Sequence, residues 1–228
     1  MPLEFPNGEL HLPVLPFSAG VEGAQRWVFT PWGTVVSLVC IVLVLLSIRP
    51  LVRIWPMVIR GAAYARTNIE VGRNLSIRRS QDLSLALLAP STITLLYLYG
   101  VFGITVWKTI LFIAGYFILR NIVYTILRHR KISYDDWSGV GHSLVAGGIF
   151  LSVLVILSFV LSYIFGIGGN ALGTIFRVEL ILVASIHLKN IFEIVKLYYT
   201  PFRTFLYLCA LEILPLASCI AAFVLSRI

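Results

Sequence analysis

Six long apolar stretches constrain this chain more than any other feature of its sequence. They cover about residues 33–54, 83–103, 106–127, 140–165, 174–196 and 203–226. A helix needs about 20 mostly apolar residues to cross a bilayer, and each stretch reaches that length. The composition agrees, with 59% hydrophobic and 12% charged residues. The sequence therefore predicts an all-α, polytopic membrane protein with a six-transmembrane-helix bundle, and it excludes a soluble enzyme, a disordered chain and a fibrous protein.

Basic residues are distributed unevenly among the connections between these stretches. Twelve of the 18 lysines and arginines follow the first, third or fifth stretch: Arg49, Arg53, Arg60, Arg66, Arg73, Arg78, Arg79, Arg128, Arg130, Lys131, Lys196 and Arg203. Positive residues beside membrane helices are retained in the cytoplasm, so we expect these connections there and both chain termini on the opposite side. The same distribution explains the net charge of +8 without nucleic acid as a partner.

Two segments flank the first apolar stretch. Residues 1–32 form an N-terminal segment on the non-cytoplasmic side, with Trp27, Phe29 and Trp32 as interfacial anchors ahead of a transmembrane domain over 33–228. Residues 55–82 form a basic cytoplasmic segment in which arginines alternate with branched apolar residues. This pattern predicts either an amphipathic helix on the anionic lipids of the inner leaflet or a docking arm for a cytoplasmic partner.

Glu212, near the centre of the sixth stretch, is the residue least compatible with lipid. Insertion of an ionisable side chain into the hydrocarbon costs about 2.5 kcal/mol or more, so such a residue needs a partner, a water-filled cavity or a functional role. We expect Glu212 to pair across the bundle or to remain protonated. The candidate partners are Arg120, His187 and Lys189. Pro215 follows closely and frees a backbone carbonyl, which favours an irregular backbone beside the carboxyl.

The fifth stretch is the most polar of the six. Glu179, Asn190 and Glu193 fall within about 60° of one another on a helix, so this face should turn away from lipid. Lys189 and Glu193 are four residues apart and could instead neutralise each other. The predicted intramembrane polar site comprises Glu212, Arg120, Asn121, His187, Lys189, Asn190, Glu193 and Glu179.

A second candidate site opens the fourth stretch. Asp135, Asp136 and His142 lie at its cytoplasmic boundary, where they could bind a cation or act on a phosphate-bearing headgroup. Capping of a helix N-terminus is the simpler explanation of the two aspartates. The three cysteines show no metal-binding spacing and are expected as small buried hydrophobic residues, so neither a metal nor a cofactor is predicted.

The sixth stretch reads Phe205-Leu206-Tyr207-Leu208-Cys209-Ala210-Leu211-Glu212-Ile213-Leu214-Pro215-Leu216. With the Arg120-Asn121 pair, it resembles an uncharacterised family of Bacteroidota integral membrane proteins that is known only as a domain of unknown function. The resemblance covers the C-terminal two thirds of the chain. It implies an inner-membrane protein whose non-cytoplasmic side is the periplasm, with no known activity, cofactor or catalytic residue.

Three functions fit these features. The favoured hypothesis is a non-enzymatic subunit or accessory component of a cell-envelope complex, with another membrane protein or a second copy of the chain as partner. The first alternative is a proton-coupled carrier or flippase for a lipid-linked or amphiphilic solute, in which Glu212 titrates. The second alternative is an interfacial enzyme that acts on a lipid headgroup through Asp135, Asp136 and His142.

Overall fold

The computed structural model describes residues 31–99, 101, 106–127 and 134–213. Helices make up 93% of these residues, and no strand occurs among them. In chain order the elements are α2 (Pro31–Ala63), α3 (Ala65–Arg73), α4 (Leu75–Leu98), α5 (Val106–Leu127), α6 (Tyr134–Phe165), α7 (Gly169–Lys196), α8 (Pro201–Leu208) and the π-helical turn η1 (Cys209–Ile213). The all-α prediction is confirmed for this part of the chain.

Four of these helices have the length and apolar composition of membrane spans. They are Gly33–Ala63, Leu75–Leu98, Asp136–Phe165 and Gly169–Lys196, within α2, α4, α6 and α7. The third predicted stretch forms α5 over the expected residues. The sixth is described only as far as Ile213, in α8 and η1. Residues 1–30 of the predicted N-terminal segment, with Trp27 and Phe29, lie outside the described residues, whereas Trp32 is part of α2.

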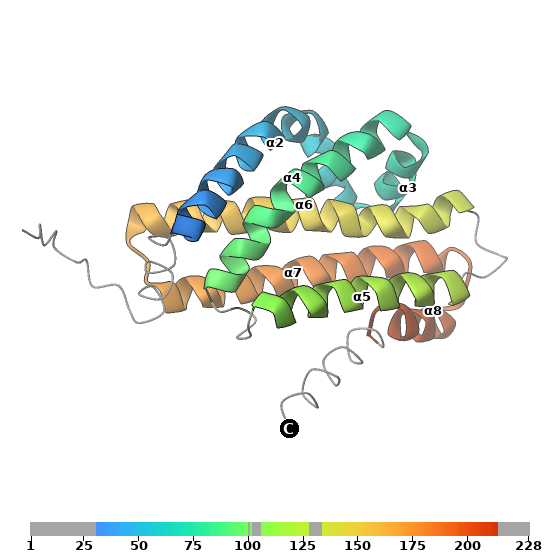
Figure 1. Ribbon diagram of the computed structural model, residues 1–228. Helices are drawn as coiled ribbons and strands as arrows, with labels where there is room; N and C mark the ends of the chain where they lie inside the picture. Colours follow the sequence, from blue (N-terminus) through green and yellow to red (C-terminus); the bar gives the residue numbers. More distant parts are fainter. Residues whose placement is uncertain (1–30, 100, 102–105, 128–133, 214–228) are drawn as a thin grey trace, which may run out of the picture.

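Helix α6 lies at the centre of the bundle, where α2, α3, α4 and α7 all pack against it. It runs beside α7 along most of its length (Figure 1). The connection between them is short because Gly166 adopts a φ of 65°, a left-handed conformation that glycine reaches without steric cost. A short turn of this kind makes the two helices antiparallel neighbours.

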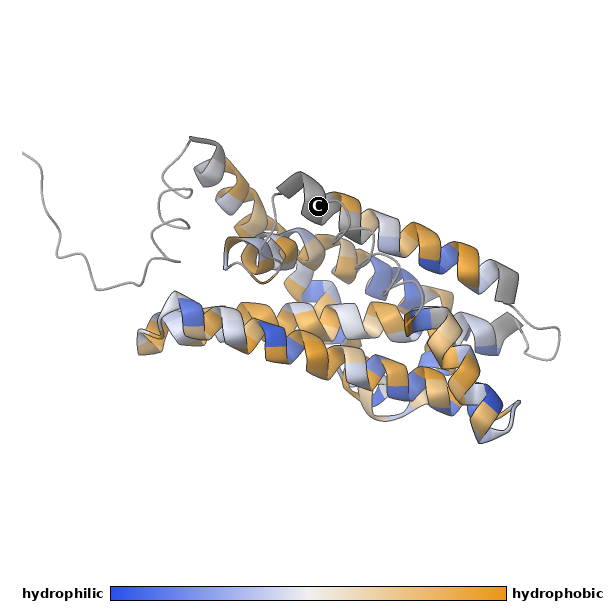
Figure 2. Cartoon of the chain, turned by 90° about the horizontal axis from the view of Figure 1, so that it is seen from below, coloured by the Kyte–Doolittle hydropathy of each residue, from blue (hydrophilic) through white to orange (hydrophobic). Residues whose placement is uncertain are grey.

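The core consists of three apolar clusters spaced along α6. One contains Val140 and Ile191, a second contains Leu88 and Ile149, and the third is built around Phe176. Hydrophobic residues also extend over most of the length of the long helices (Figure 2). Many of these remain exposed, particularly on α2, where the surrounding phase must be apolar for such a surface to be stable.

The basic segment 55–82 contains the end of α2, the whole of α3 and the start of α4. Helix α2 continues to Ala63, α3 follows after one residue, and Asn74 caps α4 by accepting bonds from the backbone nitrogens of Ser76 and Ile77 at 3.2 and 3.4 Å. Helix α3 is amphipathic, but its apolar side packs on α6. Its buried residues are Ala65, Asn68, Ile69 and Val71. That side therefore contacts protein, and only the opposite side is open to lipid or to a partner.

Candidate functional site

Glu212 lies in an irregular part of the backbone. Helix α8 changes at Cys209 to the π-helical turn η1, which ends at Ile213. Pro215 lacks the amide hydrogen that would continue regular helical bonding, which is a physical reason for a wider turn here. The Glu212 side chain is only 5% exposed. A buried carboxylate at this position requires partners from other helices.

The main partners of Glu212 come from one face of α5. Arg120 donates from Nε and Nη2 to the Glu212 Oε1 atom at 3.0 and 2.9 Å, and the Arg120 side chain is also only 5% exposed. The hydroxyl of Tyr124 donates to the same oxygen, and Tyr116 donates to Oε2 at 2.8 Å. Residues 116, 120 and 124 are four apart, so their side chains lie on the same side of the helix.

Arg120 is also held by its own helix. Its Nη2 atom donates to the Tyr124 hydroxyl at 2.8 Å, and its guanidinium carbon lies 4.1 Å from the centre of the Tyr124 ring. The two tyrosines were missed by the sequence analysis. Their spacing of four residues on either side of an intramembrane arginine is the signal that could have identified them.

His187 connects the same carboxylate to two further helices. Its Nε2 atom lies 3.4 Å from the Glu212 Oε1 atom, and its Nδ1 atom lies 3.1 Å from the Ser143 hydroxyl of α6. We refer to Glu212, Arg120, Tyr116, Tyr124 and His187 as the Glu212 cluster. Through these contacts the cluster joins η1 to α5 and α7, and α7 to α6. An ion pair so placed fixes the relative positions of four elements.

Lys189, the third candidate partner of Glu212, lies elsewhere. Its Nζ atom is 3.6 Å from a Glu193 carboxylate oxygen, and the two side chains are 55% and 43% exposed. The same atom donates to the carbonyl of Ala63 at 3.3 Å, at the C-terminal end of α2. Lys189 and Glu193 therefore pair with each other four residues apart, which is the alternative that the sequence offered. Asn121 is exposed on α5 and lies outside the Glu212 cluster.

Asn190 belongs to a different buried contact. Its side-chain amide donates to the Gly61 carbonyl of α2 at 2.9 Å, and the amide of Asn68 in α3 donates to the same oxygen at 2.9 Å. Both asparagines are buried. Gly61 lies in the last turn of α2, where carbonyls lack an intrahelical partner, so its oxygen can accept both bonds and ties α2, α3 and α7 closely together. Asn68 had no distinguishing sequence signal.

The residues of the second candidate site have separate surroundings. Asp136 accepts a hydrogen bond from the Tyr198 hydroxyl and lies 3.8 Å from Nη2 of Arg73. His142 is buried and packs against Gly72 of α3, where an added Cβ would lie 2.9 Å from its Cδ2 atom. The side chain of Asp135 lies outside the described side chains. Within the described residues, no three His, Cys, Asp or Glu side chains come close enough to hold a metal ion.

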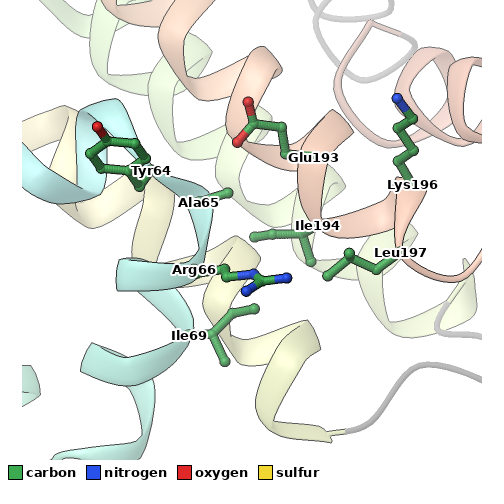
Figure 3. A pocket seen from close by; sticks show the side chains of 8 residues that line it. All are labelled: Tyr64, Ala65, Arg66, Ile69, Glu193, Ile194, Lys196 and Leu197. Carbon is green, nitrogen blue, oxygen red and sulfur yellow. The ribbon is translucent and has the colours of Figure 1, made fainter.

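A pocket of about 430 Å³ lies between α3 and the end of α7. In Figure 3 the Arg66 side chain extends between Ile69 and Ile194 towards Leu197, and Lys196 stands at the rim. The remaining lining residues are Tyr64, Ala65 and Glu193. The pocket thus combines an apolar floor with two cations and the Glu193 carboxylate, which is paired with Lys189. None of the residues that line it belongs to the Glu212 cluster.

Comparisons with protein-family models, curated proteins and solved structures found no match to this chain.

Proposed function

We propose that this chain is a non-enzymatic membrane protein that serves as a subunit or accessory component of a cell-envelope complex. The observation that supports this function best is the pairing of Glu212. Its Oε1 atom has Arg120, Tyr124 and His187 as neighbours, and its Oε2 atom accepts from Tyr116. A carboxylate that is paired with side chains of neighbouring helices holds those helices together, which suits an architectural role.

The proposed topology has six transmembrane helices and both termini in the periplasm, in the inner membrane of a Bacteroidota cell. The positions of two basic residues support this topology. Arg66 follows the first stretch and Lys196 follows the fifth, so both are expected in the cytoplasm, and the two residues line one pocket. A six-span chain brings these two connections to the same side of the bilayer.

The proposed partners are a second membrane protein or another copy of this chain, together with anionic lipid. We assign the lipid phosphate to the pocket of Arg66 and Lys196. Both α2 and α7 end beside this pocket, which supports a position at the depth of the lipid headgroups. The apolar floor suits the upper part of an acyl chain, and the two cations suit a phosphate.

Replacement of both Arg66 and Lys196 by glutamine is expected to weaken anionic phospholipid binding about 30-fold, since each basic residue contributes about 1 kcal/mol at a charged membrane surface. Native mass spectrometry of the protein titrated with phosphatidylglycerol measures the effect. Arg79→Gln is the matched control, because Arg79 is exposed in the same basic segment but does not line the pocket. Equal losses in both variants would contradict the assignment.

Purification of tagged protein in polymer discs, followed by mass spectrometry of the bound proteins, tests the proposed function itself. We expect a partner at fixed stoichiometry with the wild type. The Glu212→Gln variant should lose that partner or be less abundant, because it disrupts the helices that present the interface. The Glu193→Gln variant, which removes an exposed charge, should keep the partner. Normal abundance and an intact complex in Glu212→Gln, with a lost transport or catalytic activity, would contradict an architectural role.

A proton-coupled carrier remains the second candidate. The observation in its favour is the line of hydrogen-bonding groups from Tyr116 through Glu212 and His187 to Ser143. Such a line could pass a proton between helices. If reconstituted protein moves neither protons nor labelled lipid across vesicles, this candidate fails. The interfacial enzyme has less support, because Asp136 and His142 have different neighbours.

A further inference from the structure

A second buried carboxyl, Glu179, lies on α7 away from the Glu212 cluster. It is 9% exposed. Ten residues separate it from the first residue of α7, Gly169, which corresponds to about 15 Å along the helix axis. This is about half the thickness of the hydrocarbon layer, so Glu179 lies near the middle of a candidate membrane span. It is also about 12 Å along the axis from His187.

The surroundings of Glu179 differ in kind from those of Glu212. Its Oε1 atom accepts a hydrogen bond from the Ser158 hydroxyl of α6. Its Oε2 atom is buried and has no hydrogen-bond partner among the described residues. Glu179 also forms no ion pair with any described lysine, arginine or histidine, in contrast to Glu212. The carboxyl therefore faces neutral groups only within the part of the chain that the structure describes.

The nearest groups on both helices offer no compensating charge. Ser162 lies one turn beyond Ser158 on α6, and its hydroxyl is buried without a partner among the described residues. Arg177 is close in sequence but is exposed, about 200° around α7 from Glu179. The Glu179 carboxyl and the partly buried Ser158 hydroxyl thus meet at the contact between α6 and α7, and the buried Ser162 hydroxyl lies one turn further along α6.

An ionised carboxylate in such a place would cost several kcal/mol, because neither water nor a cation offsets the loss of hydration. A neutral carboxylic acid avoids that cost, and its Oε1 atom still accepts the hydrogen bond from Ser158. We propose that Glu179 is a proton-binding site of the membrane domain, with Ser158 as its hydrogen-bonding partner, and that this site is separate from the ion-paired Glu212. The inference does not depend on the proposed function. It also means that Glu179, and not Glu212, is the carboxyl that binds and releases a proton.

Infrared spectroscopy of the reconstituted full-length protein at neutral pH tests this proposal. The carbonyl stretch of a protonated carboxylic acid is separate from the bands of carboxylates and amides, and it shifts when the acid proton is exchanged for deuterium. We expect this band in the wild type and in Glu193→Gln, and its loss in Glu179→Gln. The Glu179→Gln side chain is neutral and nearly isosteric, so the variant should keep its oligomeric profile. Identical wild-type and Glu179→Gln spectra in this region would overturn the proposal.

A second measurement uses the wild type alone and so does not depend on the folding of a variant. Dicyclohexylcarbodiimide reacts with protonated carboxyls in apolar surroundings: the carboxyl oxygen bonds to the carbodiimide carbon, the acid proton moves to nitrogen, and the adduct rearranges to a stable N-acylurea. Peptide mapping should locate the adduct on Glu179, with Glu212 as an unmodified internal control and with less adduct at higher pH. An adduct on Glu212 with none on Glu179 would overturn the proposal.

Discussion

Glu212→Gln is expected to lower the free energy of unfolding by about 3 kcal/mol. The substitution leaves Arg120 as a buried cation without its counter-ion, and loss of one member of a buried pair is costly because the remaining charge stays out of water. Four helical elements meet at the Glu212 cluster, so the loss should loosen α5 from the rest of the bundle. Titration with denaturing detergent, monitored by tryptophan fluorescence in mixed micelles, measures the change.

Two controls distinguish this effect from a general loss of charge. Glu193→Gln removes a carboxylate from an exposed pair on α7 and should cost less than about 1 kcal/mol. The double variant Arg120→Met and Glu212→Met should recover much of the loss, because it leaves neither charge unpaired. If Glu193→Gln and Glu212→Gln have equal effects, the ion pair does not hold the bundle together.

Gly139→Ala is expected to lower the free energy of unfolding by about 1–3 kcal/mol, although alanine is the better helix former. An added Cβ at Gly139 would lie 2.7 Å from the Ile69 Cγ1 atom. It would also lie 3.2 and 3.3 Å from the Cα and N atoms of Ile69, so the backbone of α3 has to move. The same detergent titration measures the loss, and the substitution should also reshape the pocket that Ile69 lines.

Gly141 on the same helix provides the matched control. A Cβ at this position meets no atom within 4 Å. Gly141→Ala should therefore stabilise the protein by about 0.5–1 kcal/mol through helix propensity alone. The two alanine substitutions thus have opposite expected signs. If Gly139→Ala also stabilises the protein, α3 does not pack closely on α6.

Much of the local structure follows from the sequence. The lengths and apolar composition of the stretches predict helices at membrane length, and α5 covers the expected residues. The need of Glu212 for a partner also follows, because an isolated charge is unstable in hydrocarbon. The i, i+4 relation of Lys189 and Glu193 is equally local and describes their observed contact. The tyrosines at four-residue spacing from Arg120 could have been identified by the same reasoning.

Local sequence does not decide which of the candidate residues pairs with Glu212. Arg120, His187 and Lys189 were equivalent candidates for Glu212, and the structure brings only the first two to it. Glu179 was expected on the same polar face, yet it contacts Ser158 of α6 and has no cation beside it among the described residues. These outcomes depend on how each helix is rotated about its axis. The polar residues of α6 do not gather on one side of the helix, so its sequence has no apolar stripe from which that rotation can be inferred.

The sequence by itself therefore determined that the chain is helical and suited to a membrane, and which of its side chains need compensation there. These properties depend on composition and on contacts within one or two helical turns. Only the tertiary structure decided that Glu212 is paired with cations, that the described neighbours of Glu179 are uncharged, and that the apolar side of α3 is covered by α6. Those outcomes arise from the register and rotation of helices far apart in the chain, which local periodicity does not specify.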